Sequence, residues 1–212
     1  MTTLSDHRTV QTPVRDQGRR SACVGFAVAA AHEWMRADKV RSVEDVLWVA
    51  HQMGGDPNLE ATTVQYALQG LQQHRHADEA AWPYGLPAFP AERPKEARDV
   101  QNQADLVAWR RMRSLALDAI ADEIAHARAV VLTLGVVVGA WPKSGLVDAP
   151  AGRKTPGAHA VLAVGTTTLA SDIRTVIKNS WGVAWGVDGY GLVSPRYLEQ
   201  YARAGHVLEP AA

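Results

Sequence analysis

The sequence predicts an α+β protein with two segregated lobes. Helical patterns with apolar faces fill the first half of the chain, and runs of β-branched residues fill the second half. A stretch with four prolines lies between the two halves. Helices followed by strands, each group packed within its own part of the chain, are typical of the α+β class.

The composition fits a protein with a large core and no dominant charge. The chain has 212 residues, 47% of them hydrophobic, with 22 basic and 22 acidic side chains. One or two domains are expected at this length. The balanced charge argues against a dedicated nucleic-acid binder, and we interpret the short basic cluster Arg110, Arg111 and Arg113 as a solvated helix face.

The single cysteine, Cys23, cannot form an intramolecular disulfide, which favours a reducing compartment. The N-terminus lacks a basic segment followed by an apolar core, and no apolar stretch is long enough to span a membrane. We therefore expect a cytoplasmic protein without a signal peptide, a membrane span or a membrane partner.

Three helices are expected in the first half. The first occupies the apolar segment 21–39, with Ser21 as its N-cap and Cys23 in its first turn. The second covers 42–53 and opens at Ser42, and the third covers 62–74. The first helix is apolar on nearly every face, which indicates a helix buried in the middle of the molecule.

The second half is expected to be mainly strand. The proline-rich stretch 82–97 is interpreted as an extended crossover that marks the seam between the halves. A short amphipathic helix follows at 115–129. Strands are then expected at three β-branched runs and in a glycine-rich segment, which cover 130–138, 159–168, 174–181 and 182–194.

The position of Cys23 decides between two interpretations. A free cysteine is most often a small buried hydrophobic residue. At the first turn of a helix, however, the unpaired backbone N–H groups and the helix dipole favour the thiolate. A nucleophilic cysteine also needs a base, a group that orients the base, and donors for the oxyanion.

His159 is the histidine best placed to be that base. It starts an apolar strand directly after two small residues, and Asn179 ends the neighbouring strand with an amide that can accept the imidazole N–H. Trp181 and Trp185 follow closely and can cover this hydrogen bond from water. The remaining histidines that the patterns place are interpreted as structural or surface residues without a metal site: His32, His51, His74, His76 and His126.

These residues lie in three ordered motifs that resemble those of papain-family, cathepsin-like cysteine peptidases. The motifs are "TPVRDQGRRSAC", "GAHAVLAVG" and "IKNSWGVAWGVDGYGLV". His159 and Asn179 follow Cys23 by 136 and 156 positions, close to the separation expected for this family. Together the motifs cover nearly the whole chain.

The resemblance implies a fold and a role for each residue. The expected fold has a helical left lobe with a central helix that bears the cysteine, a β-barrel-like right lobe, and an active-site cleft between them. A single catalytic domain would span 1–212, with lobes at about 12–95 and 96–212. Cys23 would be the nucleophile, paired as thiolate with an imidazolium at His159. Asn179 would orient His159, Trp181 would shield this pair, and Gln17 would donate to the oxyanion beside the Cys23 N–H. No metal or cofactor is implied.

The sequence departs from the family pattern around the expected cleft. Arg20 replaces a disulfide cysteine, Ser21 replaces a glycine, Val24 replaces a tryptophan, and 57–64 replaces the glycine-rich wall of the left lobe. Four residues are candidates for substrate binding: Arg20, Ser21, Ala158 and Trp181. Arg19 and Arg20 have two interpretations. They can face solvent or pair with a carboxylate such as that of Glu60, or one can face the cleft and favour acidic substrate side chains.

The leading hypothesis is a cytoplasmic, bacterial-type peptidase that acts on a peptide or protein and has neither disulfides nor a pro-segment. Only eleven residues precede the first motif, so we expect substrate choice or a regulatory partner to restrain the activity. A peptide ligase, cyclase or transamidase would use the same acyl-enzyme, and a non-catalytic peptide-binding module could use the same fold.

Overall fold

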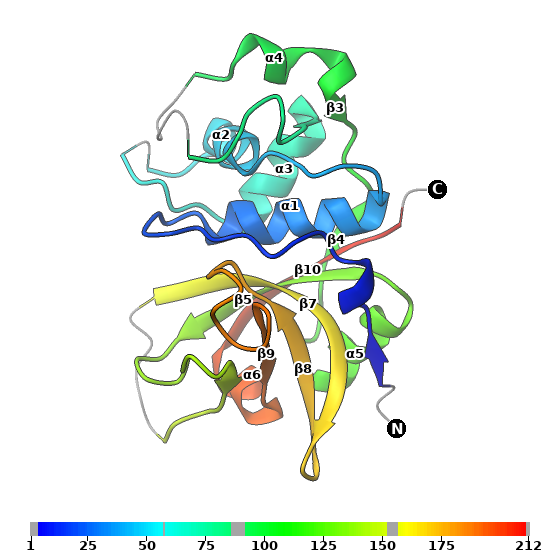
Figure 1. Cartoon of the computed structure of the whole chain (residues 1–212), viewed down its shortest axis with the longest axis vertical. Coiled ribbons are helices and arrows are strands. Elements are labelled where there is room, and N and C mark those ends of the chain that lie inside the picture. The colour runs from blue at the N-terminus through cyan, green and yellow to red at the C-terminus, as the bar shows by residue number, and fades with distance from the viewer. Residues whose placement is uncertain (1–3, 57, 86–91, 152–156, 211–212) are drawn as a thin grey trace.

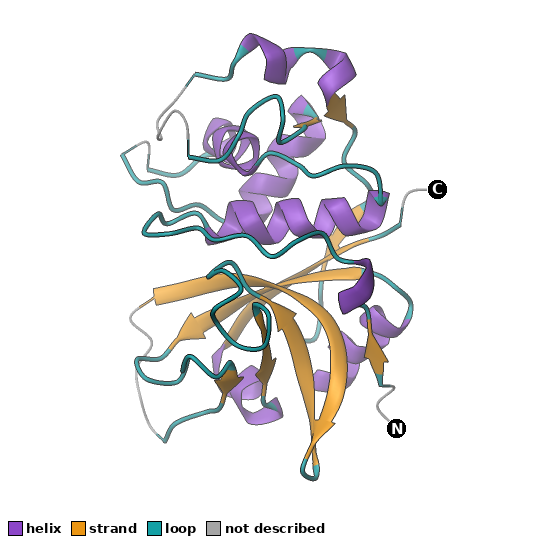
Figure 2. Cartoon of the chain, in the orientation of Figure 1, coloured by secondary structure: helices purple, strands orange, loops and turns teal. Residues whose placement is uncertain are grey.

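Most helical residues lie in one part of the molecule and the main sheet lies in the other, where two further helices accompany it (Figures 1 and 2). The prediction of an α+β protein is confirmed. The computed structural model describes residues 4–56, 58–85, 92–151 and 157–210. Helix α1 (Cys23–Arg36) runs along the junction between the helical lobe and the sheet (Figure 1). No helix in these ranges is long and apolar enough to cross a membrane.

The other elements of the helical lobe lie on the side of α1 that faces away from the sheet (Figure 1). They are α2 (Val43–Met53), α3 (Val64–His74), α4 (Lys95–Arg98), the 3-10 helix η2 (Val100–Asn102) and the antiparallel pair β2 (His76–Ala77) and β3 (Gln103–Ala104). The Ser42 side chain caps α2, as predicted, by accepting a hydrogen bond from the N–H of Asp45. Gly70 lets α3 approach α2, because a Cβ there would lie 2.4 Å from the carbonyl oxygen of Val49.

The predicted N-cap of α1 is wrong by one residue. Ala22 is the N-cap and makes no side-chain cap hydrogen bond, so Cys23 is the first residue of the helix. The Ser21 N–H is instead held by the Glu60 carboxylate at 3.1 Å. The start of α1 is therefore fixed by a contact with a distant segment and not by a local cap.

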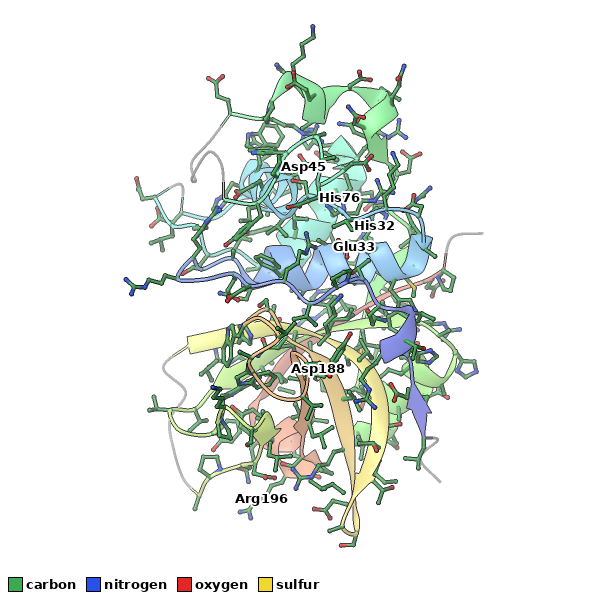
Figure 3. All side chains as sticks on the ribbon, in the orientation of Figure 1. His32, Glu33, Asp45, His76, Asp188 and Arg196 are labelled. Carbon is green, nitrogen blue, oxygen red and sulfur yellow. The ribbon has the colours of Figure 1, made fainter. Side chains whose placement is uncertain are left out.

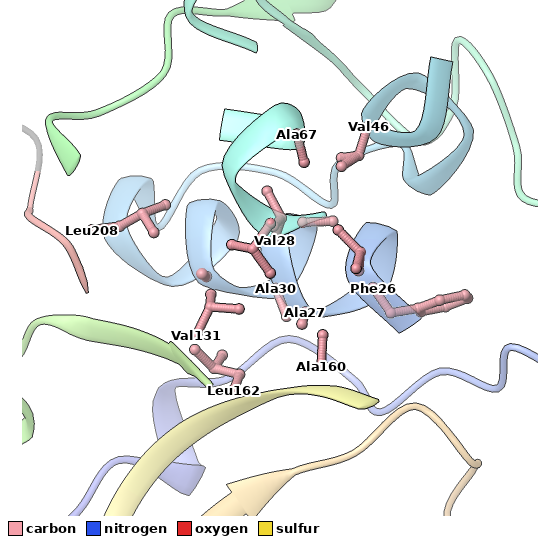
Figure 4. Close-up of a cluster of buried hydrophobic side chains, with 14 of the residues drawn as sticks. Phe26, Ala27, Val28, Ala30, Val46, Ala67, Val131, Ala160, Leu162 and Leu208 are labelled. Carbon is pink, nitrogen blue, oxygen red and sulfur yellow. The ribbon is translucent and has the colours of Figure 1, made fainter. Parts of the chain in front are cut away.

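Helix α1 is buried along nearly its whole length because it contacts both lobes. Figure 4 shows Ala27 and Ala30 of α1 beside Ala160 and Leu162 of the sheet, while Val46 and Ala67 approach from α2 and α3. The small alanine side chains allow this close approach on both sides. Burial of this central cluster accounts for the apolar character of the sequence segment.

The sheet lobe is built on eight strands. Its elements are β1 (Ser5–Asp6), the 3-10 helix η1 (Arg8–Val10), β4 (Trp109–Arg111), α5 (Leu117–Ala125), β5 (Ala129–Val136), β6 (Leu146–Val147), β7 (Gly157–Leu169), β8 (Asp172–Lys178), β9 (Tyr190–Val193), α6 (Pro195–Tyr201) and β10 (Ala202–Leu208). The strand order is β4-β10-β5-β7-β8-β9-β6, and β1 pairs with β7. All these pairs are antiparallel except β6 with β9.

The sheet is curved but does not close into the barrel that the family resemblance implied. Its order ends at β4 and β6, which are not hydrogen-bonded to each other. One face carries Val131 and Leu162 and packs on α1, and the other carries Leu132 and Ile177 and packs with α5 and α6. This alternation along the strands follows the two-residue period of β-structure.

The seam between the lobes lies later in the chain than expected. In the predicted crossover 82–97, residues 86–91 lie outside the described residues, and Lys95 to Ala97 belong to α4. Trp82 and Ala97 pack in one small core, and β3 pairs with β2. The chain therefore stays in the helical lobe as far as Ala104, because both ends of the proline-rich stretch are anchored there.

The basic cluster is also placed differently. Arg110 and Arg111 belong to strand β4, not to a helix face. This strand has only three residues, which is too short for a periodic pattern, and it forms by pairing with β10. Helix α6 and strand β10 were likewise not predicted, although Ser194 caps α6 and Pro195 follows as its first residue.

Candidate active site

The first and third motifs lie side by side through backbone hydrogen bonds. The Gln17 N–H donates to the Ser180 carbonyl at 2.8 Å, and the Gly182 N–H donates to the Arg15 carbonyl at 3.3 Å. Asp16 and Trp181 form an isolated antiparallel bridge between these two contacts. The segment that leads to Cys23 is therefore aligned with the segment that carries Asn179.

The second motif places His159 next to Asn179. His159 lies near the start of β7, and its Nε2 is 2.7 Å from Asn179 Oδ1. The Ser180 N–H also donates to Asn179 Oδ1, at 2.8 Å, so this atom is the amide oxygen and acts as acceptor in both bonds. Nε2 of His159 is therefore the donor, and the neutral ring keeps its basic lone pair on Nδ1.

Aromatic rings cover this hydrogen-bonded pair. Trp181 stacks on His159, with ring centroids 4.7 Å apart and planes inclined by 27°. Trp141 contacts the same imidazole edge to face at 5.5 Å, and Trp185 packs against Trp181 at 5.5 Å. The sequence indicated Trp181 and Trp185, but not Trp141, which comes from the loop after β5. Its indole N–H donates to the Tyr197 hydroxyl at 2.8 Å.

The Gln17 side chain is held at both ends. Its Oε1 accepts a hydrogen bond from the Ser180 hydroxyl at 2.6 Å, and its Nε2 donates to the Arg20 carbonyl at 2.7 Å. An amide nitrogen has two hydrogens, so one remains for a bound ligand. Ser180 thus connects Gln17 to Asn179, a role that sequence reasoning missed although the residue lies inside the third motif.

These groups border one cleft with a volume of about 730 Å³. Seven of the predicted site residues line it, namely Gln17, Arg20, Ser21, Cys23, Ala158, His159 and Trp181. Asn179 is not among the lining residues and is 4% exposed, which agrees with its contact behind His159. The segment expected to replace the glycine-rich wall contributes Ala61 to Val64.

Arg20 borders the cleft, but its guanidinium is bound to two carboxylates. Its Nε donates to Glu60 at 2.6 Å, one terminal nitrogen donates to Glu44 at 2.9 Å, and the other also contacts Glu44. The group lies over the Tyr84 ring, 4.6 Å from its centroid. This geometry supports the ion-pair interpretation of Arg20, while Arg19 is exposed.

Burial acts on both candidate reactive groups. It raises the pKa of the Cys23 thiol, although backbone N–H groups of Ala160 and Val24 act in the opposite direction. It lowers the pKa of His159 to about 4, against the effect of the hydrogen bond with Asn179. Burial therefore disfavours either charge alone. Within the described ranges, no group of three or more His, Cys, Asp or Glu side chains is arranged to hold a metal ion.

Comparisons with known proteins agree with these motifs and with the fold. The family model described as papain family cysteine protease matches residues 2–204. Cysteine proteinase B of Leishmania mexicana is 29% identical over 218 residues, which cover 95% of this chain and 47% of that protein. Chymopapain of Carica papaya is 29% identical over 190 residues, which cover 84% of this chain and 50% of that protein. The chain spans about half the length of these two curated relatives.

The fold comparison gives the same result. The crystal structure of xylellain, a cysteine protease from Xylella fastidiosa, matches with a TM-score of 0.81 and 22% identity, covering 98% of this chain and 91% of that one. The papain-like fold predicted from the motifs is thus confirmed, with an open sheet in place of a barrel. Together with the family match over nearly the whole length, this fold assigns the chain to the papain family of cysteine proteases.

Proposed function

We propose that this protein hydrolyses peptide bonds through a covalent thioester on Cys23. Cys23 is the nucleophile, His159 is the acid and base, and Asn179 is the residue that positions His159. The Gln17 side-chain amide and the Cys23 backbone N–H are the two donors for the oxyanion. The observation that carries the proposal is the paired hydrogen bonding at Asn179, which leaves Nδ1 of a cleft-lining imidazole free to accept a proton.

The chemistry runs in two stages. The Cys23 thiolate, whose proton has passed to His159 Nδ1, attacks the peptide carbonyl carbon, and the oxygen that becomes negative accepts hydrogen bonds from the Gln17 side chain and the Cys23 N–H. The C–N bond then breaks, and His159 gives its proton to the leaving amine. In the second stage His159 takes a proton from water, which attacks the thioester carbon. The C–S bond then breaks, the acid is released, and the thiolate-imidazolium pair is restored.

The thiolate-imidazolium pair can be tested with the pH dependence of alkylation. Burial disfavours each charge singly, so the pair forms by proton transfer between the two groups, helped by the N-terminal end of α1. We expect iodoacetamide to modify Cys23 much faster than a free thiol at pH 6, and His159→Ala to remove that advantage. Because the chain has one cysteine, the intact mass reports the site directly. A rate that rises only above the ordinary thiol pKa of about 8.5 would show that the thiol is neutral at rest.

Hydrolysis can be tested by digesting an unbiased peptide library with the purified protein and with Cys23→Ala. We expect cleavage that depends on Cys23 and products that carry one added water. Products that instead carry an added amine would identify acyl transfer. Tight peptide binding without any cleavage, in a protein whose Cys23 reacts like a free thiol, would identify a binding module and would contradict the proposal.

A further inference from the structure

The cleft extends from Cys23 to the edge of the sheet formed by β4, β10 and β5. Besides Val136 at the end of β5, four residues from these strands line it: Arg111, Thr133, Ala204 and His206. His206 is opposite Arg111, and Ala204 is opposite Thr133, so all four belong to the sheet face that packs on α1. Tyr66, at the start of α3, borders the same cleft from the helical lobe.

The side chains in this part of the cleft leave room for a ligand. Ala204 is small, and Ala158 and Ala160 of β7 are small where the cleft continues towards His159. No aspartate or glutamate occurs among the cleft-lining residues that the structure describes. A substrate side chain could therefore enter without displacing a bulky or acidic group.

His206 is a buried side chain whose two ring nitrogens form no hydrogen bond within the described part of the chain. It is 4% exposed, and neither Nδ1 nor Nε2 has a hydrogen-bond partner among the described residues. Buried polar atoms are nearly always paired, so a group of this kind that faces a cleft is a candidate for contact with a ligand. A neutral imidazole has one donor and one acceptor, and the donor can bind a carboxylate.

Arg111 adds a positive charge beside this ring. It is exposed, and in the described part of the chain no carboxylate lies within ion-pair distance of it. Its neighbour Arg110 is paired with Glu123 and Glu209. Burial, and to a lesser extent the charge of Arg111, lowers the pKa of His206 to about 4, so the ring is neutral at pH 7 and Arg111 supplies the charge.

We propose that Arg111 and His206 form a subsite for an acidic side chain of the substrate. The Arg111 guanidinium binds the carboxylate through parallel hydrogen bonds, and the His206 N–H donates a further bond from the buried side. This inference rests on the proposed peptidase function and names its substrate class. The preference for acidic substrate side chains that the sequence suggested for Arg20 is thus assigned to Arg111 and His206, because Arg20 is already paired with Glu44 and Glu60.

The test compares peptides that differ at one position by Glu, Gln or Lys. A positional-scanning library first identifies the position at which acidic residues are enriched among cleaved peptides. For a matched Glu and Gln pair at that position, we expect kcat/KM to favour Glu, and Arg111→Gln to reduce this ratio by about 10-fold or more. Arg111→Glu should turn the preference towards Lys, and His206→Leu should reduce the ratio without reversing it.

The control is Arg113→Gln. Arg113 lies two residues after Arg111, its side chain is exposed and it does not line the cleft, so the variant removes the same charge outside the subsite. It should leave the ratio unchanged. A cleaved library with no acidic preference, or a preference that survives in both Arg111 variants, would overturn the subsite while leaving the peptidase function intact.

Binding separates failure of the subsite from failure of the function. Fluorescence anisotropy with Cys23→Ala measures the affinity for labelled random peptide pools. In each pool the identified position is fixed as Glu, Gln or Lys. If no peptide is cleaved, each position is fixed in turn. Tighter binding of a Glu pool that Arg111→Gln abolishes supports the subsite even if no peptide is hydrolysed. Equal binding of all three pools overturns it.

Discussion

At the scale of single residues, the Gln17 side-chain amide is hydrogen-bonded at both its oxygen and its nitrogen. Ser180 and the Arg20 carbonyl hold its amide, so one N–H points where a ligand can use it. We expect Gln17→Ala to fold normally and to lower kcat by about 10- to 1000-fold, the usual effect of removing one oxyanion donor. The exposed Gln73 on α3 provides the matched control, Gln73→Ala, with unchanged kcat. Equal kcat in both variants would mean that the oxyanion is bound by other donors.

Asn179 acts through His159, so its prediction concerns a pH profile as well as a rate. Its hydrogen bond with His159 raises the pKa of the imidazole against the larger effect of burial. Asn179→Ala should therefore shift the fast alkylation of Cys23 to higher pH and reduce turnover by about 10- to 100-fold. A variant that loses stability but keeps the alkylation profile of the original protein would show that Asn179 is structural only.

At the scale of elements, the Arg20 ion pair ties the loop before α1 to two segments of the helical lobe. Glu44 is in the first turn of α2, and Glu60 belongs to the loop before α3 and also holds the Ser21 N–H. The side chain of Glu44 is only 3% exposed. This tie occupies the position at which the family resemblance implied a disulfide.

Breaking the tie should destabilise the protein more than a surface ion pair would. Arg20→Met leaves the buried Glu44 carboxylate without its cation, and we expect it to lower the free energy of unfolding by about 3 to 5 kcal/mol. Urea unfolding measures this, and a double-mutant cycle with Glu44→Gln isolates the pairwise contribution. A loss below about 1 kcal/mol, as for an exposed pair, would show that the interaction has no structural role.

The elements also show which patterns in the sequence were informative. Helices α2 and α3 have apolar faces long enough to define a period, and Ser42 gives a local start signal for α2. Helix α1 was indicated by a long run that is apolar on nearly every face. Strand β4 has three residues, and its Arg110 and Arg111 carry no pattern that separates a strand from a helix. Its identity depends on pairing with β10, which a single sequence does not reveal.

At the scale of the whole molecule, the motifs indicated four candidate site residues that the structure brings to one cleft, but not the contacts between distant segments. Ser180 and Trp141 contribute through hydrogen bonding and packing to groups far away in the chain. Arg111 and His206 meet only because β4 and β10 pair. The open sheet and the position of the seam likewise follow from packing, so motif spacing could not define them.

The folded molecule holds several histidines that burial keeps neutral, which gives its stability a definite pH dependence. Burial lowers the pKa of His32 to about 3 and that of His206 to about 4, and it lowers the pKa of His76, which lies beside His32 in the helical lobe (Figure 3), well below the ordinary value of 6.5. Between pH 6.5 and 4 the unfolded chain therefore binds protons that the folded protein does not bind. The free energy of unfolding therefore increases as the pH rises through this window and decreases on acidification. Each such histidine contributes a slope of up to about 1.4 kcal/mol per pH unit.

Urea unfolding at intervals between pH 4.5 and 7.5 measures this slope. We expect His206→Leu to reduce it, because the variant removes one buried ring that has no hydrogen-bond partner among the described residues. If His206→Leu and the original protein lose stability equally on acidification, then His206 takes up its proton over the same pH range in the folded and unfolded states. Arg111 and His206 would in that case form a doubly charged site in acid. The preference for Glu over Gln would then strengthen as the pH falls, until the substrate carboxyl takes up a proton near its usual pKa of about 4.3.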